Sequence, residues 1–282
     1  MRHAVSSGRP FDHIVVAVPD LDAAAATYEA LGFTLTPRAR HEDRMGTSNR
    51  LAQFAGRNFI ELLEVDRPDR LAPHDFAQTP PFFSFGDHNR RAVATGEGMS
   101  MLVFAGDDAR ADIAAFEAAG VPTYAPFDFE RQARLPDGQE ATVSFSLAFA
   151  TSPDMPEIAF FVCQNRAPQH FWKPAFQDHA NGAQGLRAVY LASPAPARDA
   201  AFVSALFGGA VTEVPGGRHV VCGPEQEVRV LSPEAIAVRD PSLDLAPDLS
   251  PRFAGIALDC TEERETTPAA AACGLFIEWV TA

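Results

Sequence analysis

A junction of helix, glycine and strand recurs along the chain at a constant spacing. Gly32, Gly120 and Gly208 each follow a stretch with helical apolar periodicity, and each lies 88 residues from the next. Glycine is favoured directly after a helix because it enters the left-handed conformation at little cost. Self-similarity at a fixed period indicates an internal repeat, so the chain is expected to fold from copies of one small unit.

Each junction belongs to a longer unit that opens with a short apolar strand. In the first two units, three further stretches after the glycine are suited to strands, and turn signals such as Pro136-Asp137-Gly138 separate them. The predicted unit is therefore strand, helix, strand, strand, strand, written βαβββ. The third unit is shorter, and the fourth is truncated. The opening strands are expected at 11–18, 99–105, 186–192 and 253–260.

Two connecting stretches lack this periodicity. Residues 66–98 and 165–185 combine prolines with aromatic and polar residues, and we expect long loops there. Loops of this length in a compact protein are usually either functional or disordered, and their aromatic content favours ordered lids. The alternative is that the phenylalanines simply pack over an exposed sheet edge.

The charge balance restricts the partners of the chain. It has 282 residues and a net charge of −14, so phosphate backbones and anionic membrane surfaces should repel it. We therefore expect neither a nucleic acid nor a membrane as a partner.

The N-terminus lacks the apolar core of a signal peptide, and no stretch reaches the length of a membrane span, which predicts a cytoplasmic protein. The cysteines form no Cys-x-x-Cys pair, which argues against structural zinc and disulfides.

The two ends of the first unit resemble a known group of proteins. Phe-Asp-His-Ile at 11–14 opens this unit, and Phe-Ile-Glu-Leu at 59–62 closes it. This combination resembles the glyoxalase-like branch of the vicinal oxygen chelate superfamily, which includes glyoxalase I, extradiol dioxygenases and bleomycin-resistance proteins. The resemblance implies an α+β fold of tandem βαβββ modules, in which paired curved mixed β-sheets enclose a cleft and the helices pack outside.

On this resemblance the chain divides into two glyoxalase-like domains. The first covers residues 1–165 and contains two modules, 11–97 and 98–165. A connector or lid at 166–184 leads to the second domain, 185–282, which holds the third module and the truncated fourth. Exposed sheet edges and the habit of the family also suggest a homodimer.

In that family a divalent metal is held by residues from the first and last strands of each module. His13 and Glu61 occupy these places in the first module. In the second, the alignment sets Ser100 opposite His13 and Phe160 opposite Glu61, so two of the expected ligands are missing. Histidine and carboxylate suit Zn, Fe, Ni or Mn, but a catalytic metal normally has at least three protein ligands. A third donor would come from a loop histidine: His41, His74, His88 or His179.

His13 and Glu61 are also candidates for catalysis. Each interrupts an otherwise apolar strand face in the period of two that strands follow. Burying a carboxylate is costly unless it is paired or coordinated, so we expect Glu61 to have a partner and to share one site with His13. The alternative is that Glu61 faces solvent and His13 is a hydrogen-bonded core residue.

Further candidates lie on the third strand and in the second connector. Thr47 and Asn49 could orient a carbonyl or carboxylate group, although Gly, Ser and Asn in this stretch are also common turn residues. Trp172 and His179 could close over the cleft, with His179 as a base or third ligand; a lone loop histidine is alternatively structural or exposed. Gln164 would be one of the few polar groups of an apolar cleft. The expected substrate-binding residues are Thr47, Asn49, Phe160, Gln164 and Trp172.

Two functions fit the predicted cleft. The first is an enzyme of the glyoxalase-like type, a lyase, isomerase or dioxygenase acting on a small carbonyl or dioxygenated substrate. In it Glu61 or His13 moves a proton next to a carbonyl, and a metal or polar side chains stabilise the oxyanion. The second is a protein that binds or sequesters a small molecule without chemistry. The missing ligands favour binding, whereas the buried pair favours catalysis.

Overall fold

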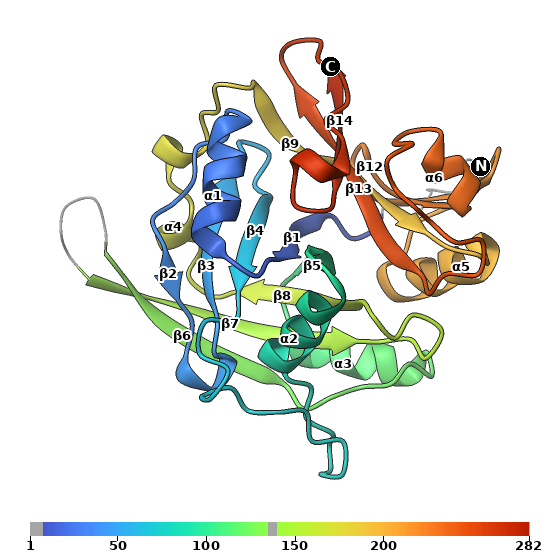
Figure 1. The fold of residues 1–282 in the computed structure, drawn as a ribbon. Helices are drawn as coiled ribbons and strands as arrows, with labels where there is room; N and C mark the ends of the chain where they lie inside the picture. The colour runs from blue at the N-terminus through green and yellow to red at the C-terminus, as the bar shows by residue number, and fades with distance from the viewer. Residues whose placement is uncertain (1–7, 135–139, 282) are drawn as a thin grey trace, which may run out of the picture.

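The computed structural model describes residues 8–134 and 140–281. It has the predicted α+β class, with two curved sheets of mixed strand direction and helices packed outside them (Figure 1). The larger sheet contains β1 (Phe11–Ala17), β2 (Ala39–Arg40), β3 (Ser48–Gln53), β4 (Phe59–Glu64), β5 (Gly98–Gly106), β6 (Phe127–Arg134), β7 (Glu140–Ala150) and β8 (Ala159–Asn165).

The eight strands of this sheet run in the order β2-β3-β4-β1-β5-β8-β7-β6. β1 pairs in parallel with β4, and β5 pairs in parallel with β8. At the centre of the sheet, β1 and β5 pair antiparallel. The strands before and after the first long connector therefore form one continuous half-barrel, and its concave face is available for a ligand.

Two helices with matching ends lie against the larger sheet: α1 (Leu21–Ala30) and α3 (Ala109–Ala118). The carboxylates of Asp20 and Asp108 accept hydrogen bonds from backbone N–H groups of the first turn, which an uncapped helix leaves unpaired. Gly32 and Gly120 follow the helices with φ angles of 90° and 73°. Caps and glycines alike are 88 residues apart, so the two strand–helix units correspond residue by residue.

The smaller sheet contains six strands in the order β10-β11-β12-β9-β13-β14. β14 pairs in parallel with β13, as β4 pairs with β1. The truncated fourth unit lacks the helix of the other units: before Gly274 the chain forms only the 3₁₀ turn η3 (Ala269–Ala271), because Pro268 and Gly274 leave too few residues for a stable helix. The elements here are β9 (Ala183–Ala192), α5 (Pro196–Phe207), β10 (Val211–Val214), β11 (Gly217–Gly223), β12 (Gln226–Leu231), α6 (Pro233–Ala237), β13 (Arg252–Cys260) and β14 (Phe276–Thr281).

One apolar core joins the two sheets. It lies behind the larger sheet, on the side away from its concave face. Phe207 of α5 stacks on Phe104 of β5 with ring centroids 3.7 Å apart. Phe160 of β8 packs against Phe207 and, edge to face, against Phe253 of β13. Side chains of both sheets therefore exclude water from the same interior.

The first long connector, expected to be a loop, contains the helix α2 (Phe85–Thr95). The hydroxyl of Ser84 caps it by accepting a hydrogen bond from the N–H of Asp87 at 3.0 Å. Its buried side includes Asp87, His88 and Asn89, so apolar periodicity could not reveal it. The second connector forms the short helix α4 (Pro168–Phe171) and the 3₁₀ turn η2 (Pro174–Phe176). Another 3₁₀ turn, η1 (Asp43–Met45), precedes β3. Of the stretches expected to form strands, the two that directly follow Gly32 and Gly120 are irregular at 33–36 and 121–124.

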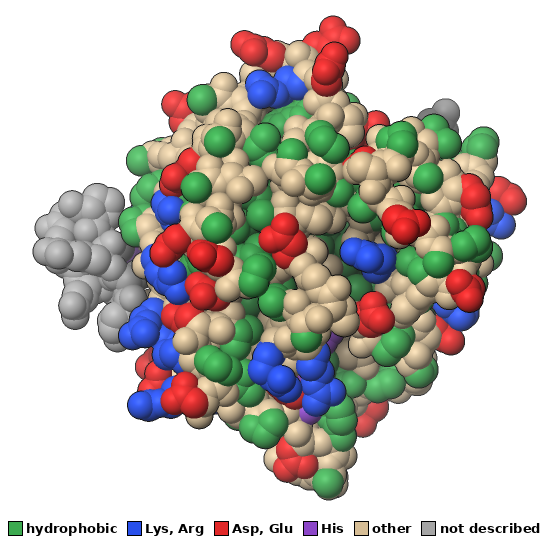
Figure 2. Space-filling view, in the orientation of Figure 1, with side chains coloured by type: hydrophobic (Ala, Val, Ile, Leu, Met, Phe, Trp, Pro, Cys, Tyr) green, Lys and Arg blue, Asp and Glu red, His purple; other side chains and the backbone are tan. Residues whose placement is uncertain are grey.

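The surface is charged, whereas four of the seven histidines within residues 8–134 and 140–281 are buried. Acidic and basic side chains are interspersed over the face seen in Figure 2, where histidine is almost absent from view. His13, His41, His88 and His179 are all buried. Within the described residues no helix is both long and apolar enough to cross a membrane. Buried imidazoles need partners, so the candidate site is found by following their contacts.

Candidate active site in the concave face

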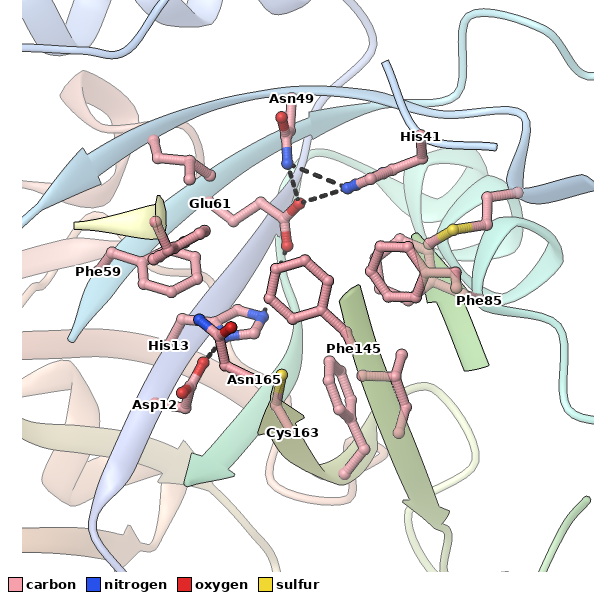
Figure 3. A pocket seen from close by; sticks show the side chains of 16 residues that line it. Asp12, His13, His41, Asn49, Phe59, Glu61, Phe85, Phe145, Cys163 and Asn165 are labelled. Atoms are coloured by element: carbon pink, nitrogen blue, oxygen red, sulfur yellow. Dashed lines mark hydrogen bonds and ion pairs between the residues drawn. The ribbon is translucent and has the colours of Figure 1, made fainter. Parts of the chain in front are cut away.

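A narrow pocket opens in the concave face of the larger sheet, with about 50 Å³ of free volume. Its walls are mainly aromatic, while a few polar side chains gather on the side formed by β1, β3 and β4 (Figure 3). An apolar cavity with a small number of placed polar groups is typical of small-molecule sites. The aromatic walls are Phe59, Phe85, Phe129, Phe145, Phe161 and Phe171.

Glu61 is the central polar side chain of this pocket. It lies on β4 and is only 4% exposed. Its Oε1 accepts a hydrogen bond from the amide of Asn49 on β3 at 2.6 Å, and its Oε2 lies 3.5 Å from Nε2 of His13 on β1. The β3–β4 and β1–β4 ladders set these three residues side by side. Glu61 therefore faces the pocket rather than solvent, and it shares one site with His13.

His13 lies between two carboxylates. Its Nδ1 donates a hydrogen bond to Oδ1 of Asp12 at 2.5 Å, and its Nε2 faces Glu61. The imidazole also stacks on Phe59, with ring centroids 4.3 Å apart and 12° between the planes. A carboxylate on one imidazole nitrogen fixes the orientation of the ring. Asp12 thus directs Nε2 of His13 toward the pocket.

His41 lies on the other side of Glu61, next to Asn49. The Asn49 amide nitrogen can only donate, so Nε2 of His41 accepts from it at 3.2 Å. Nδ1 of His41 then carries the proton and donates to the hydroxyl of Thr47 at 2.8 Å. Thr47 is fully buried behind His41 and does not line the pocket. Its role is to support the polar chain that ends at Glu61.

A cysteine of β8 also reaches the pocket. Burial, together with the negative charges of Asp12 and Glu61, raises the pKa of the Cys163 thiol well above its usual range. Nucleophilic attack and metal binding by cysteine require the thiolate. Cys163 is therefore a neutral, weakly polar part of the wall.

The helix ends correct the predicted alignment of the two modules. Because the caps Asp20 and Asp108 are 88 residues apart, the place of His13 on β5 is taken by Met101. The alignment from sequence placed the second module 87 residues after the first instead of 88, and it therefore set Ser100 opposite His13. Since successive strand residues point to opposite faces, an error of one residue exchanges the faces.

The same correction applies to the last strand. His13 of β1 is paired with Phe59 of β4, two residues before Glu61. Met101 of β5 is paired with Ala159 of β8, two residues before Phe161, so Phe161 takes the place of Glu61. Phe161 lines the pocket. Phe160, predicted to bind substrate, instead points into the core between the sheets.

The donor set does not fit a catalytic metal. Two of the four expected ligand places hold His13 and Glu61, but the other two hold Met101 and Phe161. Phenylalanine cannot coordinate a metal, and a thioether is a soft ligand that suits Cu(I) rather than Mn or Ni. Residues 8–134 and 140–281 contain no group of three or more His, Cys, Asp and Glu side chains placed to hold a metal ion. A catalytic metal site normally has at least three protein ligands.

His179 is placed in the core rather than in the pocket. Its Nδ1 accepts a hydrogen bond from the N–H of Thr34 at 2.9 Å, and its Nε2 donates to the carbonyl of Gln53 at 2.8 Å. Burial lowers the pKa of His179, which favours this neutral form. The ring ties the second connector to the strands before it, a structural role in place of the predicted base or ligand.

Two further predicted residues lie outside the pocket lining. Gln164 donates to the carbonyl of Asp107 and accepts from the N–H of Ala109, which holds the start of α3. Trp172 packs edge to face on Phe59, with ring centroids 6.0 Å apart, and is not among the residues that line the pocket. Of the predicted substrate-binding residues, only Asn49 lines the pocket.

Sequence reasoning missed Asp12, Phe161 and Cys163. The alternation of β8 sets Phe161 and Cys163 on one face and Phe160 and Val162 on the other, but only the strand pairing shows which face meets the pocket. No pattern could have identified Asp12, because neighbours on a regular strand point to opposite faces. The β1–β5 register shifts between Phe11 and His13, and this irregularity lets Asp12 reach the ring beside it.

Comparison with known proteins agrees with the observed fold. A family model described as a glyoxalase-like domain matches residues 11–207. This range ends at the last residue of α5, so it includes the start of the second predicted domain. A search of curated proteins finds no match.

Solved structures share the fold at low sequence identity. A hypothetical protein from Staphylococcus aureus is 15% identical and has a TM-score of 0.71, over 96% of this chain and 99% of that one. A Mn(II)-bound glyoxalase from Novosphingobium aromaticivorans is 14% identical, with a TM-score of 0.56 over 97% and 83%. A mutant of 4-hydroxymandelate synthase from Streptomyces coelicolor is 15% identical, with a TM-score of 0.51 over 91% and 72%. These likenesses establish the fold alone.

Proposed function

The chain belongs to the glyoxalase-like domain family, and from this premise we propose that it is an enzyme that moves a proton next to the carbonyl group of a small, largely apolar substrate. The observation that carries the proposal is the buried pair of Glu61 and His13, 3.5 Å apart in an aromatic pocket. Ionisable groups buried together in a cleft are more often found at functional sites than elsewhere.

Glu61 is the base in this proposal. It takes a proton from the carbon beside the carbonyl, and the electron pair of the C–H bond shifts to form an enolate. In its doubly protonated form, His13 donates from Nδ1 to Asp12 and from Nε2 to the enolate oxygen, where the negative charge develops. Return of the proton to the same face of this carbon gives hydrogen exchange without net change, and its delivery to the opposite face gives epimerisation. For an α-hydroxy carbonyl substrate, delivery to the former carbonyl carbon, while the hydroxyl proton moves to the former carbonyl oxygen, gives isomerisation.

The residues around the pair act as positioning groups. Asn49 holds Oε1 of Glu61, which leaves Oε2 directed toward His13. His41 accepts from the same Asn49 amide and is itself held by Thr47. Of the lyase, isomerase and dioxygenase reactions expected from the sequence, this arrangement supports those that need only proton transfer. A dioxygenase would require a redox metal, for which the donor set does not fit.

Hydrogen exchange in a neutral α-hydroxy ketone tests the proposal. In D₂O the protein should accelerate loss of the CH₂ proton signal of 2-hydroxyacetophenone, followed by ¹H NMR. Glu61→Gln should slow the catalysed exchange by about 10²–10⁴-fold, the usual contribution of a general base. Glu213→Gln, the same change at an exposed carboxylate on β10, should have no effect. Exchange by Glu61→Gln as fast as by the unaltered protein would contradict the role of Glu61.

A second function is the binding of a small molecule without chemistry. It is favoured by the apolar side chains that occupy two of the four places where the family has metal ligands. Met101 and Phe161 extend the apolar character of the site. In that case 2-hydroxyacetophenone would bind, as a titration would show, but its exchange rate would equal that in buffer. Glu61→Gln would then leave affinity unchanged.

A further inference from the structure

A second cavity adjoins the pocket. It has about 500 Å³ of free volume, and the two cavities share Asn49, Leu51 and Phe171 as lining residues. We call it the outer chamber; the stretch at 36–40, β3, and the connector residues around 170–176 form most of its wall. A molecule that fills the pocket and extends past these shared side chains would enter the outer chamber.

The wall of the outer chamber is basic in an acidic protein. Arg38, Arg40, His170 and Lys173 line it, and no Asp or Glu is among its described lining residues. The chain as a whole carries 37 acidic residues against 23 lysines and arginines, and Lys173 is its only lysine. A cavity lined by one sign of charge raises the local concentration of ligands of the opposite sign.

The two arginines of this wall differ in how far they are neutralised. Arg38 forms ion pairs with Glu64 at 2.8 Å and with Asp66 at 3.4 Å. Arg40 is exposed, and within the described part of the chain its side chain makes no hydrogen bond or ion pair. Its guanidinium is therefore available to an anion, which it can bind through two parallel N–H donors.

The connector that carries Lys173 is held firmly against the sheet. Gln53, almost completely buried on β3, donates to the carbonyl of Phe171 at 3.1 Å and accepts from the N–H of Lys173 at 3.1 Å. These two bonds hold the connector on either side of Trp172. Lys173 is therefore presented by a rigid support.

Asn49, shared by both cavities, has an unused acceptor. Because Glu61 is an acceptor, the amide nitrogen of Asn49 must face it, and the oxygen then points away (Figure 3). This oxygen is buried and has no hydrogen-bond partner in the described structure. A buried acceptor without a donor is costly, and a ligand hydroxyl or amino group would satisfy it.

We infer that the outer chamber binds the carboxylate or phosphate group of an anionic small molecule, whose uncharged part lies in the pocket. This inference rests on the proposed function, since it describes the substrate of the same site. Arg40 and Lys173 receive the anion, and Asn49 accepts a hydrogen bond from a hydroxyl or amino group between the two parts. The substrate class is thus an anion that carries an apolar carbonyl-containing part.

Binding of matched probes tests the inference. Phenylacetate, phenyl phosphate and the neutral 2-phenylethanol differ mainly in charge, and titration calorimetry gives their affinities. Both anions should bind at least about tenfold more tightly than the alcohol, with the larger gain identifying carboxylate or phosphate as the preferred group. Raising the ionic strength from about 0.05 to about 0.5 M should reduce this preference.

Variants and one labelled residue locate the anion. Arg40→Gln and Lys173→Gln should each reduce the preference for anions by about tenfold without weakening the alcohol, while Arg70→Gln, at an exposed arginine outside the chamber, should change nothing. Reductive methylation with ¹³C-formaldehyde keeps the charge of Lys173, and its signal should shift on addition of the anions.

Three results would overturn the inference: anions that bind no better than the alcohol, no binding of the anions at millimolar concentration, or an unchanged preference in Arg40→Gln. Failure of the proposed function is distinguishable from these. If 2-hydroxyacetophenone shows no catalysed exchange while the anions still bind through Arg40, anion binding in the outer chamber is supported and the proposed proton transfer is contradicted. If exchange occurs without a preference for anions, the proposed proton transfer is supported and anion binding in the outer chamber is contradicted.

Discussion

At the scale of single residues, the burial of Glu61 determines what the pocket can do. Removing an ionised carboxylate from water costs several kcal/mol, which its partners must offset. The Asn49 amide and the His13 imidazole supply those partners from neighbouring strands. A residue with a packing role alone would be apolar at this position, as Phe161 is at the corresponding place. In the proposed function, the polar chain from Asp12 to Thr47 supports a reactive carboxylate.

Removal of metal ions should leave the protein unchanged, because Met101 and Phe161 occupy two of the four metal-ligand places of the family. After dialysis against a chelator, we expect the same melting temperature and the same exchange rate with 2-hydroxyacetophenone. Elemental analysis of the untreated protein should find Zn, Fe, Ni and Mn well below one ion per chain. A stoichiometric ion that is lost in His13→Ala, with activity lost alongside it, would contradict this prediction.

At the scale of secondary-structure elements, α2 connects the stability of the fold to the pocket. The helix places Phe85 in the pocket wall. It packs closely, because a Cβ atom at Gly86 would lie 2.0 Å from the carbonyl oxygen of Met45. Asn89, also on its buried side, accepts a hydrogen bond from the hydroxyl of Ser100 on β5 at 2.6 Å. Loosening α2 would therefore alter the aromatic wall as well as the fold.

The histidine of α2 should make stability depend on pH. Burial lowers the pKa of His88 from 6.5 to about 4, while His74, Arg91 and Asp87 nearby contribute smaller effects of both signs. Between these two pH values the unfolded chain binds a proton that the folded protein does not. The stabilisation present above pH 6.5 is therefore lost as the pH falls toward 4, by up to about 3 kcal/mol.

Urea unfolding at a series of pH values measures this effect. His88→Gln can still donate to the carbonyl of Ser100, but it does not titrate, so its free energy of unfolding should fall less steeply over the same window. His170→Gln, a change at a partly exposed histidine, should retain the original slope. Identical slopes for His88→Gln and the unaltered protein would contradict the prediction.

At the scale of the whole molecule, the two sheets are bound into one unit by their shared core. The stack of Phe104 on Phe207 and the packing of Phe160 on Phe253 cross from one sheet to the other. The matched family model also ends at Phe207, inside the second predicted domain. We propose that the halves predicted as separate domains unfold together. The homodimer and the cytoplasmic location stay predictions.

Truncation of one aromatic ring should destabilise both halves at once. Phe207→Ala removes a fully packed ring, and comparable deletions lower the free energy of unfolding by about 3–5 kcal/mol. Calorimetry should show a single transition at a lower temperature. Phe76→Ala, the same deletion at a ring that is 56% exposed, should cost much less. Two separate transitions in Phe207→Ala would contradict a shared unit.

The sequence alone determined the class of fold and the elements whose signals are local. Helix caps, glycines with positive φ and alternating strands are set by neighbouring residues, so α1, α3 and the strands around His13 and Glu61 could be predicted. Tertiary structure decided which strand faces meet: it moved Phe161 into the pocket, Phe160 into the core and His179 away from the site. It also brought Asp12 to His13 through an irregularity in β1, and formed the outer chamber from Arg40 and Lys173. These depend on register and on contacts between distant segments, and no local pattern specifies either.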